Sequence, residues 1–246
     1  MIQLPISLQI YSLRSIFEDN PLKAMKAAKS AGYDGVEFYG SHFQPELYAA
    51  LLKETGLVCT GWHTSIDALE KDFEKTLSRN LAVGNKYICV PYYKADTAAG
   101  WADFAERLNK IAEKLARYGI RTGYHAHAHD FAAVEGQIPW DIVAQKTLPQ
   151  VILQIDTGNA MAGHADPLEF MEKYPGRAIT VHLKPYCAKT GYDCIIGEDD
   201  SPWEKFLAFC EQRGNTEWLI VEYEVQNDPV SAVERCAAYL RKLRPL

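Results

Sequence analysis

The chain has 246 residues, a formal net charge of -6 and a hydrophobic content of 48%. At about 150 residues per domain, this length corresponds to one large domain or two small ones. A charged fraction of 24% and a mean hydropathy of -0.22 exclude a disordered chain and a membrane-embedded one. The mildly acidic balance, with a pI near 5.7, argues against a nucleic-acid partner, because such proteins usually carry a basic surface.

The cysteines and the N-terminal segment indicate a reducing compartment. None of the six cysteines forms a C-x-x-C pair, and a chain of this length does not need disulfides for stability. The first residues, MIQLPISLQIYSLR, lack the basic region and the uninterrupted apolar stretch of a signal peptide. No run of about 18 apolar residues is present. We therefore expect a soluble, cytoplasmic protein with no membrane partner.

In chain order, eight short β-rich runs recur, and their centres lie about 20 to 40 residues apart, which is the size of a βα unit. Helical patterns separate these runs, and Pro or Gly marks many of their ends. The predicted strands cover residues 6–10, 35–39, 58–63, 86–91, 121–127, 151–156, 178–184 and 218–224. The predicted helices cover residues 44–55, 67–83, 101–115 and 201–213, start at Pro21 and Pro229, and follow Pro139 and Pro167.

Strands that alternate with helices predict a parallel sheet covered by helices. A doubly wound sheet would usually show five or six strands and a glycine-rich phosphate turn after the first. Here the sequence Tyr-Ser-Leu-Arg follows the first strand instead. Eight units in about 250 residues fit a (β/α)8 barrel. We therefore predict the α/β class, with residues 1–246 forming a single TIM-barrel domain.

Polar residues gather where the predicted strands end, which is where barrel enzymes carry their chemistry. Five of the seven histidines lie at or just after these ends, namely His63, His125, His127, His129 and His182. Two imidazoles and two carboxylates from four successive strands predict a divalent metal site of His125, Asp156, His182 and Glu222. This donor set suits Mn²⁺, Co²⁺, Zn²⁺ or Ni²⁺ better than a Ca²⁺ cage. Alternatively, each residue is satisfied separately by the backbone or by neighbouring helices.

Three residues are predicted to be catalytic. Glu222 could bind the metal and move a proton, and His127 could act as a base because it shares strand parity with His125. Lys184 could stabilise an oxyanion or neutralise an acidic group of the substrate, or form a salt bridge at the rim. Glu224 has the parity of Glu222, so it could contact substrate, support a ligand or face a helix end.

Four further residues are predicted to contact substrate. Glu37 could orient a substrate hydroxyl or pair with Arg14. His63 would lie across the barrel mouth from the metal, and Trp62 could supply an apolar face on which a sugar stacks. Glu198 lies in the long loop after the seventh strand, where it could reach the substrate or only meet water.

Several motifs in this order resemble the sugar phosphate isomerase/epimerase family, the xylose-isomerase-like barrels. GYHAH at 123–127 is similar to that family's Y-H-N-H segment, and DTGN at 156–159 to its D-T-G-N. HLK at 182–184 is similar to H-L-K-D, and VEYE at 221–224 to V-E-x-[DE]. The opening QIYSLR at 9–14, Asp228-Pro229 and the YLR at 239–241 extend the resemblance to nearly the whole chain.

The resemblance implies a (β/α)8 barrel with a divalent metal bound by His125, Asp156, His182 and Glu222. Many relatives have a glutamate that doubles as a catalytic base where this chain has His125, and Ala126 replaces an asparagine. Pro185 follows Lys184 where relatives often have aspartate, and the stretch around Glu198 only partly matches a G-E-G segment. The symmetric two-glutamate proton shuttle of the ketose 3-epimerases is therefore not expected.

The favoured hypothesis is a divalent-metal-dependent isomerase or epimerase of a sugar or sugar derivative. Mn²⁺ is the expected ion, with Co²⁺, Zn²⁺, Ni²⁺ and Mg²⁺ as alternatives. It would polarise a carbonyl, acidify the neighbouring C–H and stabilise an enediolate. A metal-dependent lyase or hydrolase of 3-keto-glycosides or C-glycosides uses the same residues, and a sugar-binding or regulatory barrel is the non-enzyme alternative. The expected partner is a small carbohydrate, and a homo-oligomer is compatible with the sequence.

Overall fold

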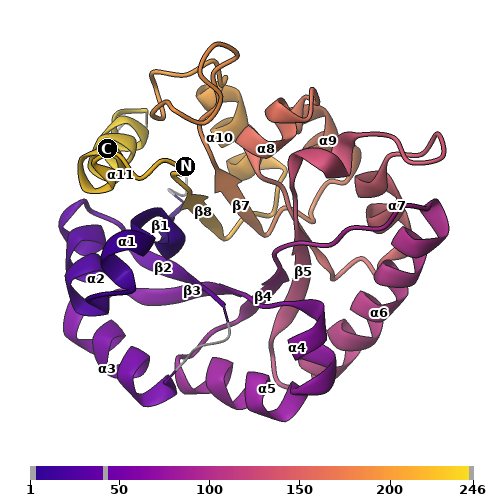
Figure 1. The fold of residues 1–246 in the computed structure, drawn as a ribbon, viewed down its shortest axis with the longest axis horizontal. Helices are drawn as coiled ribbons and strands as arrows, with labels where there is room; N and C mark the ends of the chain where they lie inside the picture. Colours follow the sequence, from indigo (N-terminus) through magenta and orange to yellow (C-terminus); the bar gives the residue numbers. More distant parts are fainter. Residues whose placement is uncertain (1–3, 41–43, 244–246) are drawn as a thin grey trace.

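The structure is a computed structural model that describes residues 4–40 and 44–243. Within this part of the chain, eight parallel strands form one sheet in the order β6-β5-β4-β3-β2-β1-β8-β7, and the helices surround it in a ring (Figure 1). The prediction of a (β/α)8 barrel is confirmed. The strands are β1 Ile6–Gln9, β2 Gly35–Tyr39, β3 Val58–His63, β4 Tyr87–Val90, β5 Arg121–His125, β6 Ile152–Gln154, β7 Thr180–Leu183 and β8 Trp218–Val221.

The connections between strands are α-helices and two short 3-10 helices. The 3-10 helices are η1 Ile10–Leu13 and η2 Ala128–Phe131. The α-helices are α1 Arg14–Phe17, α2 Pro21–Ser30, α3 Pro45–Thr55, α4 Ile66–Lys71, α5 Phe73–Ala82, α6 Ala98–Ala116, α7 Pro139–Lys146, α8 Thr157–Ala162, α9 Pro167–Lys173, α10 Trp203–Gln212 and α11 Pro229–Lys242. The prediction that residues 1–246 form a single domain stays a prediction.

Side chains cap the first turns of several helices. Asn20 caps α2 by accepting a hydrogen bond from the Lys23 N–H, with Pro21 in the first turn. Asp228 caps α11 in the same way. The helix predicted at 67–83 is instead two helices, because the chain leaves helical geometry at Asp72, between α4 and α5. The short elements η1, α1, η2 and α8 were not predicted, since each lies directly after a strand or within a loop.

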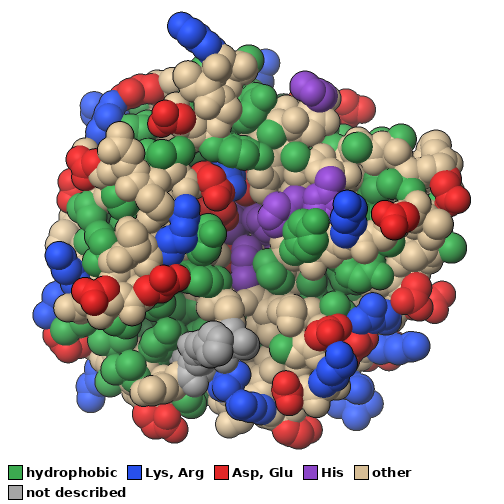
Figure 2. All heavy atoms as spheres, in the orientation of Figure 1, with side chains coloured by type: hydrophobic (Ala, Val, Ile, Leu, Met, Phe, Trp, Pro, Cys, Tyr) green, Lys and Arg blue, Asp and Glu red, His purple; other side chains and the backbone are tan. Residues whose placement is uncertain are grey.

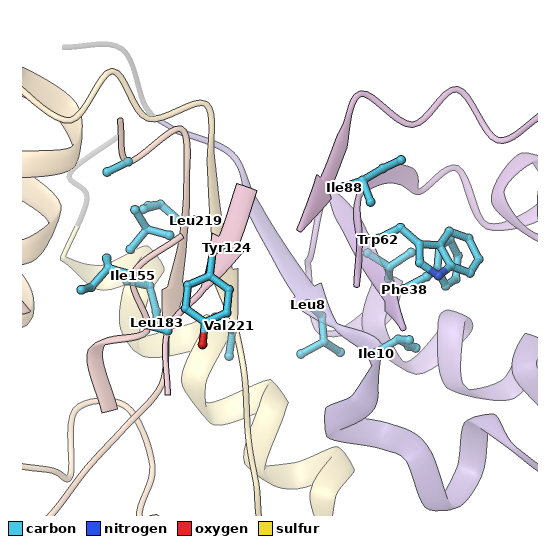
Figure 3. Close-up of a cluster of buried hydrophobic side chains, with 14 of the residues drawn as sticks. Leu8, Ile10, Phe38, Trp62, Ile88, Tyr124, Ile155, Leu183, Leu219 and Val221 are labelled. Atoms are coloured by element: carbon cyan, nitrogen blue, oxygen red, sulfur yellow. The ribbon is translucent and has the colours of Figure 1, made fainter. Parts of the chain in front are cut away.

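Alternation along the strands divides the buried residues between the two faces of the barrel wall. Apolar side chains of one face pack against the helices, and Figure 3 shows Leu8, Phe38, Trp62, Tyr124, Leu183 and Val221 among them. A second, small apolar cluster consists of Tyr87, Cys89, Ile152 and Ile179. On the upper part of the inner face, toward the carboxyl ends of the strands, the buried residues are polar, and they build the site described next.

The ring is nearly closed, and its seam lies between β6 and β7. No strand ladder joins these two elements in the described sheet; Asp156 and His182 form an isolated parallel bridge there. The His182 N–H donates to the Ile155 carbonyl at 2.9 Å. Two of the predicted metal ligands therefore lie at the joint of the barrel.

Candidate metal centre and active site

A cavity of about 710 Å³ opens at the carboxyl ends of the strands. Figure 2 shows this face, with most of the visible histidine side chains gathered in a central hollow and charged side chains at its edge. The predicted site residues that line the cavity are His63, His125, His127, Lys184, Glu222 and Glu224. The volume is in the range of small-molecule pockets.

His125, Asp156, His182 and Glu222 come together at the floor of this cavity and just beneath it. His125 and Glu222 line the cavity, whereas Asp156 and His182 are fully buried behind the lining. His125 ends β5, Asp156 caps α8, His182 lies in β7, and Glu222 directly follows β8. All four are buried, and each offers a ligand atom that lies within 4.8 Å of the other three. Two ligands on opposite sides of an ion at about 2.1 Å would lie about 4.2 Å apart, so the group nearly has the size of a divalent site. This group could hold a metal ion.

Unsatisfied polar atoms support this fit. Among the described residues, three buried side-chain atoms have no hydrogen-bond partner: His125 Nδ1, His127 Nδ1 and Asp156 Oδ2. Asp156 uses its other oxygen, Oδ1, to accept from the Asn159 N–H at 2.7 Å and so to start α8. Buried polar groups are normally paired, because an unpaired one costs about 1–3 kcal/mol. A cation beside Asp156 Oδ2 would satisfy that oxygen. The His125 nitrogen that faces the oxygen, at 3.9 Å, is Nε2 and not the unpaired Nδ1.

Burial also sets the protonation of two ligands. Burial lowers the pKa of His125 well below its usual value, so its imidazole is neutral near pH 7, as a metal ligand must be. Burial raises the pKa of Asp156, so this carboxyl holds its proton more tightly than an exposed aspartate does.

The other two ligands are held by charged neighbours. His182 Nδ1 lies 2.8 Å from Glu222 Oε2, and Lys184 Nζ donates to Glu222 Oε1 at 3.1 Å. Burial alone would raise the pKa of Glu222, but the charge of Lys184 and the hydrogen bond with His182 outweigh it and hold this pKa well below its usual value. Burial opposes charge on His182 as well, yet the neighbouring carboxylates raise its pKa to about 10.

Lys184 and His127 place two proton-carrying groups beside the ligand group. Lys184 Nζ also donates to Glu224 Oε2 at 2.5 Å and lies 4.6 Å from the ring centre of Tyr192. His127 lies 5.0 Å from His125 between ring centres, and burial lowers its pKa to about 4. A neutral imidazole with a free ring nitrogen is suited to accept a proton.

Of the predicted substrate contacts, His63 and Glu224 line the cavity, whereas Glu37, Trp62 and Glu198 are not among its lining residues. Trp62 is buried against Phe38 on the outer side of the wall, because adjacent residues of a strand face opposite sides. Glu198 forms an ion pair with Arg235, and its side chain is 58% exposed.

Glu37 is fully buried below the cavity and contacts His182 and His63. The alternative pairing of Glu37 with Arg14 is wrong. Arg14 donates to the backbone carbonyls of Tyr11 and Glu224 and lies over the Tyr11 ring.

The sequence-based site lacked several residues that line the cavity: Gln9, Tyr39, Asn159 and Tyr192. Strand parity could have found Gln9, because it pairs with Glu37 in the neighbouring strand. Tyr192 lies in the long segment between β7 and α10, and its hydroxyl donates to Asn159 Oδ1 at 2.8 Å. No local sequence signal points to that contact.

The fold and the site together define a (β/α)8 barrel with a histidine–carboxylate centre at the carboxyl ends of its strands. The family described as xylose isomerase-like TIM barrel matches residues 25–243. The chain belongs to this family.

Known proteins similar to this chain include inosose dehydratases and a structure of an isomerase/epimerase. The chain is 25% identical over 154 residues to an inosose dehydratase from Clostridium tetani, covering 55% of this chain and 50% of that protein. It is 24% identical over 247 residues to one from Bacillus licheniformis, covering 83% and 81%. The chain thus spans half the length of the first of these relatives.

A crystal structure of a sugar phosphate isomerase/epimerase from Parabacteroides distasonis superposes with a TM-score of 0.86 at 20% identity, covering 98% of this chain and 94% of that one. At this identity the match concerns the fold. The enzymes that this chain resembles are thus isomerases, epimerases and dehydratases. Within the described residues, no helix combines the length and the apolar character needed to cross a membrane.

Proposed function

We propose that this protein is a divalent-metal-dependent isomerase or epimerase of a sugar or sugar derivative. The observation that carries the proposal is the convergence of four buried ligand-type side chains at the floor of a substrate-sized cavity. A divalent ion bound there would supply Lewis acidity, which polarises a substrate carbonyl and makes the adjacent C–H more acidic. His125, Asp156, His182 and Glu222 would hold it, and Mn²⁺ is the expected ion.

The chain's own residues supply the proton transfer. His127 presents a neutral imidazole beside the ligand group, so it can take a proton from the substrate carbon. Glu222 is the alternative base, although its hydrogen bonds to His182 and Lys184 leave it less free to do so. The Lys184 ammonium reaches the cavity and can donate to a substrate oxygen on which negative charge develops.

The charge of the cavity favours an unphosphorylated substrate. Among the described residues that line it, Lys184 is the one lysine or arginine, and it already binds Glu222 and Glu224. Phosphate groups usually meet several donors or a free cationic cluster. A neutral ketose, or a cyclic polyol ketone, therefore fits this lining better than a sugar phosphate.

A lyase is the second candidate, because two of the relatives described above are inosose dehydratases. Dehydration next to a carbonyl begins with the same removal of a proton, and a hydroxyl then leaves. His127 or Lys184 could donate the proton that this hydroxyl needs.

Metal-loaded protein incubated in D₂O with ketoses, inositol ketones and 3-keto-glycosides distinguishes these functions. Deuterium at one carbon together with an isomeric or epimeric product supports the proposal. Elimination or cleavage products support the lyase. Absence of both exchange and turnover across the panel, with metal bound, contradicts both enzymes and favours the sugar-binding barrel.

A further inference from the structure

Glu37 is a fully buried carboxylate on β2, and its hydrogen-bond partners among the described residues are inward-facing side chains of other strands. Its Oε2 lies 2.6 Å from His182 Nε2 and accepts from Gln9 Nε2 at 2.7 Å. Its Oε1 accepts from Gln154 Nε2 at 3.0 Å. Because it lies below the cavity rather than in its lining, Glu37 contacts a predicted metal ligand and not the space for substrate.

His182 turns one ring nitrogen, Nε2, toward Glu37 and the other, Nδ1, toward the ligand group. An ionised carboxylate only accepts hydrogen bonds, so Nε2 must donate to it. The other nitrogen, Nδ1, lies 3.9 Å from Asp156 Oδ2 and 2.8 Å from Glu222 Oε2, so it is the nitrogen that faces the ligand group.

The surrounding wall leaves Glu37 little freedom. Gly61 on β3 faces it, and a Cβ atom at Gly61 would overlap Glu37 Oε1. The pairing of β2 with β3 shifts register between Val36 and Glu37, so a bulge lies at this point. Gln154 is itself oriented, because its Nε2 also donates to Thr180 Oγ1 at 2.9 Å and its Oε1 lies 2.8 Å from His63 Nε2.

We propose that Glu37 is a positioning residue that holds the Nε2–H of His182, so that Nδ1 is the metal-binding nitrogen. Histidines that bind metals commonly donate their other N–H to a carboxylate, which fixes the tautomer and the ring orientation. The inference rests on the proposed metal centre and deepens it. It replaces the expected contact between Glu37 and substrate with a role beneath the metal.

The test uses the full chain with Co²⁺ as the probe. Replacing Glu37 with Gln keeps the size of the side chain but turns one acceptor into a donor, which meets the N–H groups of its neighbours. We expect the Co²⁺ dissociation constant to rise about 10- to 100-fold, measured against a competing chelator. The matched control is Ser7→Ala, which breaks the buried hydrogen bond to Thr60 and touches no predicted ligand. It should change the constant by less than about threefold.

Nitrogen-15 spectra of His182 in the Zn²⁺-loaded wild-type protein give a measurement that needs no variant. We expect a protonated Nε2 and a metal-bound Nδ1, and coordination through Nε2 overturns the inference even if Glu37→Gln fails to fold. Equal Co²⁺ binding by wild type and Glu37→Gln overturns this inference alone. A wild-type protein that binds no divalent cation contradicts the proposed function itself.

Discussion

The two ends of the barrel treat buried polar groups differently. At the amino ends of the strands they are paired: Ser7 Oγ lies 2.5 Å from Thr60 Oγ1, and the Thr122 hydroxyl donates to the Ile88 carbonyl at 2.8 Å. At the carboxyl ends, buried atoms of His125, His127 and Asp156 have no partner. Such atoms weaken the fold unless something binds them. The contrast teaches that the lower end of the barrel, at the amino ends of the strands, is built for stability. The upper end, at the carboxyl ends of the strands, retains polar atoms for binding.

The largest expected effect comes from removing a ligand at the upper end. Asp156→Ala should abolish stoichiometric divalent metal, measured by elemental analysis. Because polarisation of a carbonyl by a metal contributes several kcal/mol, kcat/KM should fall about 100- to 1,000-fold. Ser7→Ala, at the lower end, should retain both metal and activity. Full activity of the Asp156→Ala protein would contradict the conclusion that the upper end is the binding end.

Lys184 tests whether charge compensation at the upper end also stabilises the fold. Lys184→Met removes the ammonium group beside the buried Glu222, which should cost about 3 kcal/mol and lower Tm by about 6–12 °C. The control is Lys189→Met, which removes an exposed lysine from the same loop and should leave Tm nearly unchanged. Equal melting of the two variants would mean that the buried ion pairs add no stability.

The buried carboxyl of Asp130 should make the free energy of unfolding depend on pH. Burial raises its pKa to about 7 in the folded protein, whereas the unfolded value is about 4. The folded state therefore holds the extra proton between pH 4 and 7, so its stabilising effect is complete below pH 4 and is lost as the pH rises through 7.

In urea unfolding with chelator present, Asp130→Asn should remove a slope of about 1.4 kcal/mol per pH unit across this window. Asp166→Asn changes an exposed helix cap and should leave the slope as it is in the wild type. An unchanged slope in Asp130→Asn would show that this carboxyl titrates at an ordinary pH.

The smallest expected effect concerns Glu198. Its ion pair with Arg235 lies on the surface outside the cavity, so Glu198→Gln should leave kcat/KM within about twofold, since exposed pairs contribute little. Steady-state kinetics with the substrate that the D₂O experiment identifies would measure this ratio. A rise in KM of tenfold or more would show that Glu198 contacts substrate and that the long loop between β7 and α10 is part of the binding site.

The fold and the convergence of the four ligands could be predicted, because both follow from the regular spacing of strands and helices and from their order along the chain. Eight βα units define the barrel. In such a barrel the carboxyl ends of all strands lie at one end, so His125 and Glu222 are expected to lie near each other at the mouth. Their role as metal ligands stays a prediction. Parity could also have separated Trp62 from His63, because neighbours in a strand face opposite sides.

Other features depend on contacts that no local pattern encodes. The environment of Glu37 is set by the bulge at Gly61 and by glutamines from β1 and β6, which are far apart in the sequence. The direction of the segment from 184 to 202 decides that Tyr192 enters the cavity while Glu198 does not. Long loops are placed by tertiary packing rather than by propensity, so this outcome could not be predicted from sequence.

The seam between β6 and β7 has a consequence for the mechanics of the ring. A closed barrel spreads strain over all its strands, but the joint between β6 and β7 has no strand ladder. The Asp156–His182 bridge and a few separate hydrogen bonds connect it, among them His182 to the Ile155 carbonyl and Leu153 to the Arg177 carbonyl. Local opening starts where backbone pairing is sparse. An ion that binds both side chains would therefore connect β6 and β7 across this sparsely paired joint, and the ring would become more rigid when the site is occupied.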